Sequence, residues 1–349
     1  MIYFIFIPLS FLLSCLLVYL IKNQLSAHLI DIPNERSSHT QPTPRGGGLG
    51  FVASFFIVSW CFSWLFTPNT VSTAHINVSH IWLVLLPLTV VGLLDDRSHI
   101  PARLRYLVQI VAASIAISFF GIFPQPWLTN LGPVGITVAI LLTLVGMTAL
   151  INFYNFMDGL DGLVGGITMI QLSLIALMGN QPLWVLLIAA LAGFLYWNWS
   201  PAKIFMGDVG STVLGATVAI ALFNYSHHAS VVQAWSALTI TLPIAGDAIY
   251  TLICRLKRRE NIFKAHRTHL YQRLHQAGWN HSQVAISYMI FTSAIGLNIY
   301  LLGSVGAWIN LLITIAAIAF LEMYLKQLTT YSREKVLTKD VKDVNDASK

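Results

Sequence analysis

The sequence predicts an all-α, polytopic integral membrane protein, and three observations support this. Of the 349 residues, 56% are hydrophobic and only 10% are charged, whereas a soluble globular chain is about 25% charged. Apolar runs long enough to cross a bilayer recur along the whole chain. No stretch alternates in polarity as a barrel strand would, so helices must satisfy the backbone hydrogen bonds in lipid.

We expect about eleven transmembrane helices, with the N-terminus outside and the C-terminus in the cytoplasm. The first span has no basic residue before it, Lys22 after it and no small-residue cleavage site, which favours an anchor over a signal peptide. Alternating sides from there places all 20 Lys and Arg residues in inner segments. The spans are predicted at 2–21, 49–66, 79–94, 106–123, 134–153, 163–178, 182–197, 209–223, 232–253, 284–302 and 306–325.

A single transmembrane domain is predicted for residues 1–325, followed by a polar cytoplasmic tail at 326–349. The three cysteines, Cys15, Cys61 and Cys254, suggest neither a disulfide framework nor a metal site. The pI near 9.2 comes from the inner loops and fits anionic lipid or substrate better than nucleic acid. The predicted inner loops are 22–48, 95–105, 154–162, 198–208 and 254–283.

The loop before the second span contains the sequence PTPRGGG at 42–48. Backbone N–H groups at the start of a helix can bind phosphate, and the three glycines at 46–48 stand just before that span. A flexible entry into the helix explains the glycines equally well. Arg36 and Arg45 add positive charge under either interpretation.

The third span ends with Asp95 and Asp96. Buried acids in a membrane are costly and usually mark a function. Two carboxylates at this place can hold a divalent cation, or one of them can take a proton. The alternative is a solvated loop with salt bridges to Arg97, Arg103 and Arg105.

The central stretch, NFYNFMDGLDG at 152–162, carries Asn152, Asn155, Asp158 and Asp161 at intervals of three. On a helix, neighbours at this spacing lie close together, so the four side chains can form one polar cluster. Asn, Asp and Gly are also ordinary turn residues. A plain loop is therefore an equal interpretation of this stretch taken alone.

Asp208 lies between Gly207 and Gly210, and Pro201 ends the helix before it, so a ligand has space to approach. Asp208 can also cap the next helix by accepting hydrogen bonds from its first N–H groups. A carboxylate has two oxygens, so capping and metal ligation are compatible.

The largest inner loop is predicted to contain a short amphipathic helix over about 263–276. His266, His269 and Arg273 would then share one face. No third soft ligand accompanies the two histidines, which argues against zinc. Together with Arg267 they are better suited to donate hydrogen bonds to phosphate. The alternative is an interfacial helix that only contacts lipid headgroups.

Five motifs stand in order along the chain: PTPRGGG at 42–48, LLDD at 93–96, NFYNFMDGLDG at 152–162, IFMGDVGS at 204–211 and HRTHLYQRL at 266–274. Together they resemble the polyprenyl-phosphate N-acetylhexosamine-1-phosphate transferases. The HRTHLYQRL form is similar to the O-antigen-initiating branch. It lacks the consecutive histidines of the peptidoglycan branch, which argues against a muramoyl-pentapeptide substrate.

The resemblance implies a bacterial inner-membrane enzyme with residues 1–325 as its catalytic domain and its active site on the cytoplasmic face. It would transfer an N-acetylhexosamine 1-phosphate from a UDP-sugar to undecaprenyl phosphate and release UMP. The lipid-linked pyrophosphate sugar would start O-antigen or another surface polysaccharide. The implied partners are the UDP-N-acetylhexosamine, undecaprenyl phosphate and membrane lipid, with a homodimer as an open option and no nucleic acid.

The resemblance also assigns roles to residues of this chain. Asp208 and Asn155 match the ligands of Mg²⁺, the implied cofactor. The catalytic residues would be Asp208 and the pair Asp95 and Asp96, which match the acids assigned to the lipid phosphate and to catalysis. Among the substrate-binding residues, Phe205 would stack on uracil and Asp161 would hydrogen-bond that base. Asp158 would also bind substrate. The loop with His266, Arg267 and His269 would close on the pyrophosphate or sugar.

A secondary transporter is the competing hypothesis, because Asp247 lies inside a span. Transporters place ionisable groups near the midplane and often show internal repeats, whereas the other acids here gather at inner span ends and no repeat is found. Two questions stay open: which N-acetylated sugar is used, and the order of bond making. The lipid phosphate can attack the UDP-sugar directly, which we favour, or a carboxylate such as Asp208 can attack first.

Overall fold

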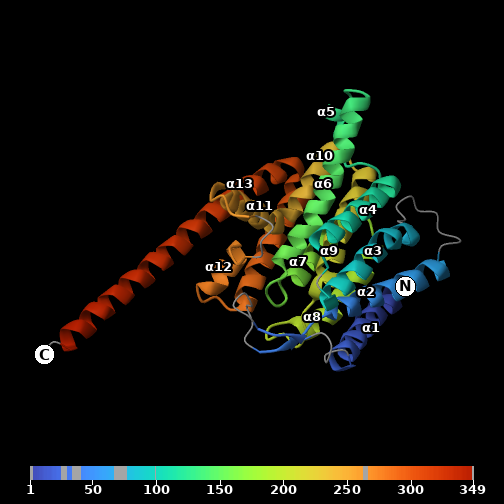
Figure 1. The fold of residues 1–349 in the computed structure, drawn as a ribbon. Helices are drawn as coiled ribbons and strands as arrows, with labels where there is room; N and C mark the ends of the chain where they lie inside the picture. Colours follow the sequence, from blue (N-terminus) through green and yellow to red (C-terminus); the bar gives the residue numbers. More distant parts are fainter. Residues whose placement is uncertain are drawn as a thin grey trace.

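The computed structural model describes residues 3–24, 30–33, 41–66, 77–98, 100–261 and 266–347 of the chain. These residues are helical except for connecting loops and a two-residue antiparallel ladder between β1 (Ile30–Asp31) and β2 (Thr43–Pro44). The fold is therefore all-α, as predicted (Figure 1).

The helices follow one another with short connections. Figure 1 shows α5 at one end of the bundle and α12 towards the other. Their bounds are α1 (Tyr3–Gln24), α2 (Gly47–Phe66), α3 (Val78–Ser98), α4 (Ala102–Phe120), α5 (Pro126–Thr129), α6 (Pro133–Met157), α7 (Leu163–Gly179), α8 (Leu183–Asn198), α9 (Gly207–His228), α10 (Val231–Leu238), the 3₁₀ turn η2 (Thr239–Thr241), α11 (Leu242–Lys257), α12 (Leu270–Gln276) and α13 (His281–Ala347).

Long apolar helices make this chain a multi-pass membrane protein. Within the described ranges, eight helical stretches are long and apolar enough to cross a membrane, and α7 and α8 are shorter apolar helices. The last stretch, 281–328, contains Gly303 with φ 55° and ψ −125°, so α13 is two helices joined at a kink. The number of spans and their orientation stay predictions.

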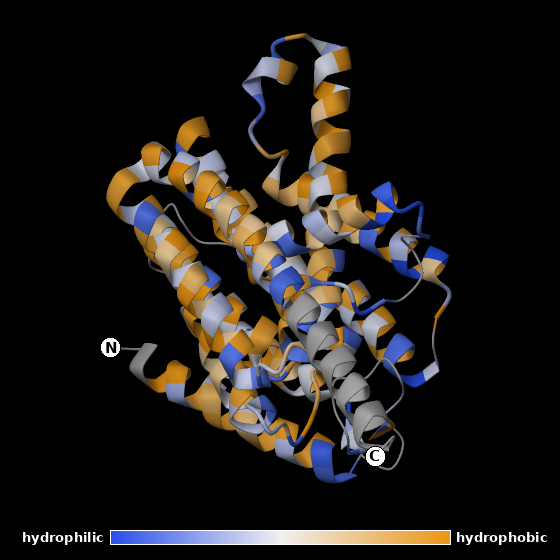
Figure 2. Cartoon of the chain, turned by 90° about the vertical axis from the view of Figure 1, so that its left-hand side faces the viewer, coloured by the Kyte–Doolittle hydropathy of each residue, from blue (hydrophilic) through white to orange (hydrophobic). Residues whose placement is uncertain are grey.

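The outer surface of the bundle is apolar. Figure 2 shows hydrophobic residues along most of the helices and hydrophilic residues mainly at helix ends and in loops. Large side chains such as Leu142, Ile290 and Leu312 are more than half exposed. Lipid is the medium in which such a surface is stable, since a water-exposed apolar patch of this size would be unfavourable.

Helix α9 lies at the centre of the bundle and is almost entirely buried. It packs against α2, α3, α6 and α7 (Figure 1). Small residues allow these close approaches: a Cβ added to Gly92 of α3 would lie 2.7 Å from Val209 Cα, and one added to Gly215 of α9 would lie 2.8 Å from Ile151 Cα of α6. Close packing of small residues is a usual way to join helices in lipid. It fixes the position of Asp208, in the first turn of α9.

Gly47 and Gly48 serve helix packing, and the phosphate-binding interpretation is wrong for these two glycines. The Gly47 N–H donates to Phe205 O at 2.9 Å and the Gly48 N–H donates to Met206 O at 2.8 Å. A Cβ on Gly48 would lie 2.5 Å from Gly210 N. These amides are already bonded to carbonyl groups, so they are not available to a phosphate.

The helix predicted over 263–276 is also wrong in its extent. Residues 263–265 lie outside the described residues, and 266–269 are not helical. Helix α12 begins at Leu270, with His269 as its N-cap at φ −61° and ψ 150°. His266, His269 and Arg273 therefore do not share a helix face. The helix starts at Leu270 because the Asp247 carboxylate accepts the N–H groups of Leu270 and Tyr271.

Candidate functional site

A cavity of about 310 Å³ lies where the ends of α3, α4, α6 and α9 meet the segment before α12. Its apolar wall includes Leu88 and Val91 of α3. The polar side chains that line it include Asp95, Arg105, Gln109, Asn152, Asn155, Asp208, His266 and His269. Residues from four of the five sequence motifs thus border the cavity or its rim, and two carboxylates face it together.

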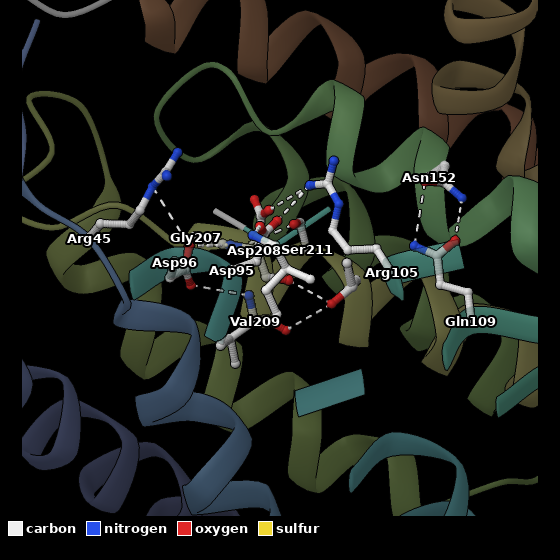
Figure 3. Close-up of polar contacts among 12 residues, drawn as sticks. Arg45, Asp95, Asp96, Arg105, Gln109, Asn152, Gly207, Asp208, Val209 and Ser211 are labelled. Carbon is white, nitrogen blue, oxygen red and sulfur yellow. Dashed lines mark hydrogen bonds and ion pairs between the residues drawn. The ribbon is translucent and has the colours of Figure 1, made fainter. Parts of the chain in front are cut away.

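Arg105 joins the two carboxylates in this cavity. Its Nη1 lies 2.6 Å from Asp95 Oδ2 and 3.4 Å from Asp208 Oδ2 (Figure 3). Asp95 Oδ1 also accepts the Ile100 N–H at 2.7 Å, so the loop after α3 holds this carboxylate in place. The carboxylates of Asp95 on α3 and Asp208 on α9 therefore point at one position. Their two negative charges make that position favourable for a cation.

Asp96 points away from the cavity, although it is next to Asp95 in the sequence. Its carboxylate accepts the N–H groups of Asp208 at 2.9 Å and Val209 at 3.3 Å, the first amides of α9. Its side chain is 0% exposed. Gly207 has φ 77°, and a Cβ there would lie 2.5 Å from Asp96 Oδ2. Asp96 is thus the N-terminal cap of α9, a position where negative charge is stabilised, and Asp208 does not cap its own helix.

Arg45 lies on the other side of the acidic cluster from Arg105 (Figure 3). Its Nε is 3.8 Å from Asp96 Oδ1, and its Nη2 is 3.5 Å from Asp31 Oδ2. Burial acts to lower the pKa of Arg45, but Asp208, Asp96, Asp31 and Asp158 outweigh it and hold the pKa above its ordinary value. A permanent cation therefore stands beside the acids at the start of α9.

The DGLDG stretch is a turn, so the four polar residues spaced by three are divided between a helix and a loop. Asn152 and Asn155 lie on α6, while Asp158 is the residue after the helix end. Burial raises the pKa of Asp158 to about 8, with Asp208, Asp96 and Asp161 acting in the same direction and Arg45 against them. The Asp158 carboxyl is therefore mostly protonated at neutral pH.

Asp161 organises the loop that carries Phe205. Its Oδ2 accepts the Ala202 N–H at 3.1 Å and lies 3.0 Å from His281 Nδ1. Phe205 is half-buried, and its N–H donates to Pro44 O at 2.8 Å. Neither Asp161 nor Phe205 is among the residues that line the cavity. They lie with Arg45 and Asp158 on a neighbouring part of the same end of the bundle.

His266 and His269 reach the cavity, and Arg267 between them does not line it. The two rings stack with centroids 4.9 Å apart. Burial lowers the pKa of His266 to about 4, and the charges of His269 and Arg255 add to this, while Asp247 opposes it. At neutral pH the His266 ring is therefore an uncharged hydrogen-bonding group.

Gln109 and Arg105 are among the polar residues of the cavity that were not predicted to belong to it. Gln109 of α4 pairs with Asn152 of α6: the Asn152 Nδ2 donates to Gln109 Oε1 at 2.7 Å and to Thr148 O at 2.8 Å. Arg105 was expected only as part of a salt-bridged loop. Their spacing of four places Arg105 and Gln109 on one face of α4, a signal that the sequence did contain.

Asp247 has a different role from the one that suggested a transporter. Its buried carboxylate accepts hydrogen bonds from the protein, including the N–H groups of Leu270 and Tyr271 and the hydroxyl of Tyr288 at 2.7 Å. A transport site needs a carboxylate that is available to a solute. The observation that favoured transport is therefore explained by the anchoring of α12.

The cavity offers oxygen atoms that fit a magnesium ion. Asp95, Asp208 and Asn155 all line it, and carboxylate and amide oxygens are the protein ligands that Mg²⁺ prefers. The described part of the chain contains no group of three or more His, Cys, Asp or Glu residues placed to hold a metal. A metal here would complete its shell with water and phosphate oxygens, which is usual for Mg²⁺.

Comparison with known proteins agrees with the motifs. Residues 78–226 match the family described as Glycosyl transferase family 4. The chain is 27% identical to the "Probable undecaprenyl-phosphate N-acetylglucosaminyl 1-phosphate transferase" of Bacillus subtilis, over 94% of each protein. It is 26% identical to the "Undecaprenyl-phosphate alpha-N-acetylglucosaminyl 1-phosphate transferase" of Yersinia pestis, over 80% of this chain and 77% of that protein.

A relative from the peptidoglycan branch is similar at the same level. The chain is 28% identical to the "Phospho-N-acetylmuramoyl-pentapeptide-transferase" of Deinococcus radiodurans, over 75% of this chain and 86% of that protein. Overall identity thus does not separate the branches. The matched region spans α3 to α9 and contains Asp95, Asn155 and Asp208, which line one cavity. By its motifs, the matched region and these relatives, the chain is similar to the polyprenyl-phosphate N-acetylhexosamine-1-phosphate transferases.

Proposed function

We propose that this chain transfers an N-acetylhexosamine 1-phosphate from a UDP-sugar to undecaprenyl phosphate at the cytoplasmic face of a bacterial inner membrane. UMP leaves, and the lipid-linked pyrophosphate sugar begins a surface polysaccharide such as O-antigen. The observation that carries the proposal is the convergence of Asp95 and Asp208 on Arg105 in a cavity at the ends of membrane helices. The relatives from Bacillus subtilis and Yersinia pestis are named for undecaprenyl phosphate, which supports the acceptor.

The position of the cavity suits two substrates that arrive by different routes. A lipid phosphate stays at the membrane face, and the apolar wall of Leu88 and Val91 continues from the acids along α3. A nucleotide sugar comes from water. The side chain of Arg105 is 40% exposed. It would hold the acceptor phosphate between the apolar wall and the water.

The reaction is a direct displacement at the β-phosphorus of the UDP-sugar. An oxygen of the lipid phosphate forms the new P–O bond, the bond to the bridging oxygen breaks, and UMP leaves with that electron pair. A phosphate monoester is already largely dianionic near pH 7, so it needs orientation more than deprotonation. Asp95 and Arg105 would orient the lipid phosphate. Asp96 would contribute indirectly, because it holds the start of α9 and thereby the position of Asp208.

The remaining residues would bind the donor and balance its charge. Asp208 and Asn155 would hold Mg²⁺, which when bound neutralises pyrophosphate charge. Phe205 would stack on the uracil, near Asp158 and Asp161. His266 is neutral at pH 7 and so would donate a hydrogen bond to the pyrophosphate rather than pair with it as a cation.

A substrate panel tests the proposal. Purified protein is incubated with undecaprenyl phosphate, Mg²⁺ and each of several UDP-N-acetylhexosamines, and UMP release is measured. We expect release with a UDP-GlcNAc-derived sugar, and loss of nearly all release in the near-isosteric Asp208→Asn variant. Release with the muramoyl-pentapeptide nucleotide alone would contradict the branch assignment. Residual activity of Asp208→Asn within about tenfold of wild type, roughly 1.4 kcal/mol of barrier, would contradict the role of Asp208.

A further inference from the structure

Asp247 is the most densely bonded carboxylate of the described chain outside the cavity. It lies on α11, is 3% exposed, and receives donors from α11, α12 and α13. The donors and their distances to its oxygens are the Leu270 N–H at 2.9 Å, the Tyr271 N–H at 3.0 Å, the Tyr288 hydroxyl at 2.7 Å, the Thr251 hydroxyl at 3.2 Å and His269 Nδ1 at 3.3 Å. Backbone N–H groups can only donate, so the carboxylate is the acceptor of this network.

The contact with His269 determines which ring nitrogen carries the proton. A carboxylate oxygen next to a nitrogen lone pair would be repulsive, so Nδ1 of His269 must carry hydrogen to bond Asp247. The Gln272 N–H also approaches the His269 side chain in a capping box, so it competes with Asp247 for the ring; the buried carboxylate is the stronger partner, because a hydrogen bond to a charged group is about twice as strong as a neutral one. In the neutral ring, Nε2 then has a free lone pair, and His269 lines the cavity.

His266 has the opposite arrangement. The Thr268 N–H points at His266 Nδ1 at 3.4 Å, and the Thr268 hydroxyl lies 3.0 Å from the same nitrogen. A backbone N–H only donates, so Nδ1 of His266 is an acceptor and Nε2 carries the proton. The two stacked rings therefore offer the cavity one donor, from His266, and one acceptor, from His269.

The segment that carries the histidines is also fixed from two other sides. The Tyr271 hydroxyl donates to Phe156 O at 2.9 Å, and it lies 2.3 Å from where a Cβ on Gly159 would stand. Arg273 of α12 forms an ion pair with Glu322 of α13. Tyr271 and Arg273 thus share the anchoring of α12 with Asp247, whereas the contact with the His269 ring is made by Asp247.

We propose that Asp247 is a positioning residue for donor recognition: it fixes His269 with the proton on Nδ1, so that Nε2 accepts a hydrogen bond from an O–H or acetamido N–H of the donor sugar. This rests on the proposed function. The acceptor on His269 complements the donor on His266, which would bond the phosphate oxygens of the donor, since these oxygens can only accept. Together the pair discriminates the sugar end of the donor from its pyrophosphate.

The direct test is the tautomer of His269 in the wild-type protein. Selective ¹⁵N-histidine labelling at pH 8 distinguishes protonated from unprotonated ring nitrogens, and the His269 signals are assigned by their loss in His269→Gln. We expect hydrogen on Nδ1 of His269. Hydrogen on Nε2, as a bond from the Gln272 N–H would require, overturns the proposal. This measurement needs no activity, so it stands even if the substrate panel fails.

The kinetic test separates positioning from general stability. Asp247→Asn places an NH₂ or a weaker acceptor against His269 Nδ1. We expect the KM for the UDP-sugar to rise at least about tenfold, with the KM for undecaprenyl phosphate unchanged. The matched control is Thr251→Val, which removes another donor to the same carboxylate and should keep both KM values near wild type.

A double-variant cycle tests whether Asp247 acts through His269. If it does, Asp247→Asn combined with His269→Gln has the same donor KM as His269→Gln alone. Additive effects, or equal changes in the KM of both substrates, would show that Asp247 only stabilises the fold. If Asp247→Asn does not fold, the wild-type tautomer still decides the question.

Discussion

At the scale of single residues, the acidic pair after α3 divides into two functions. Asp95 faces the cavity and pairs with Arg105, whereas Asp96 is buried beneath the first amides of α9. A carboxylate that meets substrate and one that caps a helix respond differently to loss of charge. The pair therefore offers two nearly isosteric substitutions with distinguishable results.

We expect Asp95→Asn to lower kcat by roughly 100-fold or more with a smaller effect on Tm. Asp96→Asn should instead lower Tm, because its new NH₂ group faces an N–H of α9, a cost of about 1–3 kcal/mol. Thermal unfolding and steady-state kinetics of both variants check this. A large loss of kcat in Asp96→Asn at unchanged Tm would give Asp96 a direct chemical role.

The Asp158 carboxyl should make stability depend on pH. Its pKa in the folded protein is about 8, above the ordinary value of 3.8, so between these values the folded state holds a proton that the unfolded state has lost. The free energy of unfolding then falls as pH rises from about 4 to 8. Asp158→Asn should remove this slope and raise Tm at pH 8–9. Thermal unfolding across pH in the absence of substrate measures it, and equal slopes in both proteins would contradict the assignment.

At the scale of secondary-structure elements, the start of α9 is held by its neighbours. Asp96 of α3 bonds its first amides, and Gly48 of α2 lies against Gly210. Gly207 makes both contacts possible, since its φ of 77° is a conformation that other residues adopt only with strain.

Substitution of Gly207 tests this junction, with Gly132 as the matched control. Both glycines have positive φ, but a Cβ on Gly132 meets nothing within 4 Å, whereas one on Gly207 meets Asp96. We expect Gly132→Ala to cost only backbone strain, about 1–3 kcal/mol, since its φ of 73° and ψ of −153° lie in a region almost restricted to glycine. Gly207→Ala should lose more stability and most activity. Equal losses of Tm would show that the contact with Asp96 is unimportant.

The sequence was sufficient to predict the long apolar helices and the residues at their ends that face the cavity. Asp95, Asn155 and Asp208 stand at the ends of apolar runs, so their side chains had to meet at one face of the membrane. The cap at Asp96 was not predictable, because it depends on how α3 crosses α9. Helix α12 starts later than its pattern suggests because Asp247, distant in the sequence, supplies its first hydrogen bonds.

At the scale of the whole molecule, the two ends of the bundle differ in charge. The end with the cavity carries Arg45, Arg105 and the acids (Figure 3), while α5, which has no charged residue, lies at the opposite end (Figure 1). By the positive-inside rule we expect the basic end to face the cytoplasm. That assignment determines which compartment supplies the nucleotide sugar.

Cysteine labelling tests the orientation. With the three natural cysteines replaced, a cysteine at Asn130 should react with an impermeant thiol reagent in intact cells. A cysteine at Gln276 should react only after the membrane is opened. Both side chains are exposed, so burial does not explain a difference. Labelling of Gln276→Cys from outside would separate the cavity from cytoplasmic nucleotide.

The burial of α9 also determines which part of the site can fluctuate. The amides of Gly47, Gly48, Asp208 and Val209 are bonded and enclosed by packed helices, so their hydrogens should exchange with deuterium only when the bundle opens as a whole. The amides at 266–269 belong to a non-helical segment and should exchange earlier. We expect donor nucleotide to slow exchange at 266–269 and leave α9 unchanged, as followed by mass spectrometry. The acids would then be a rigid template against which the histidine segment closes, and equal exchange in both segments would contradict this.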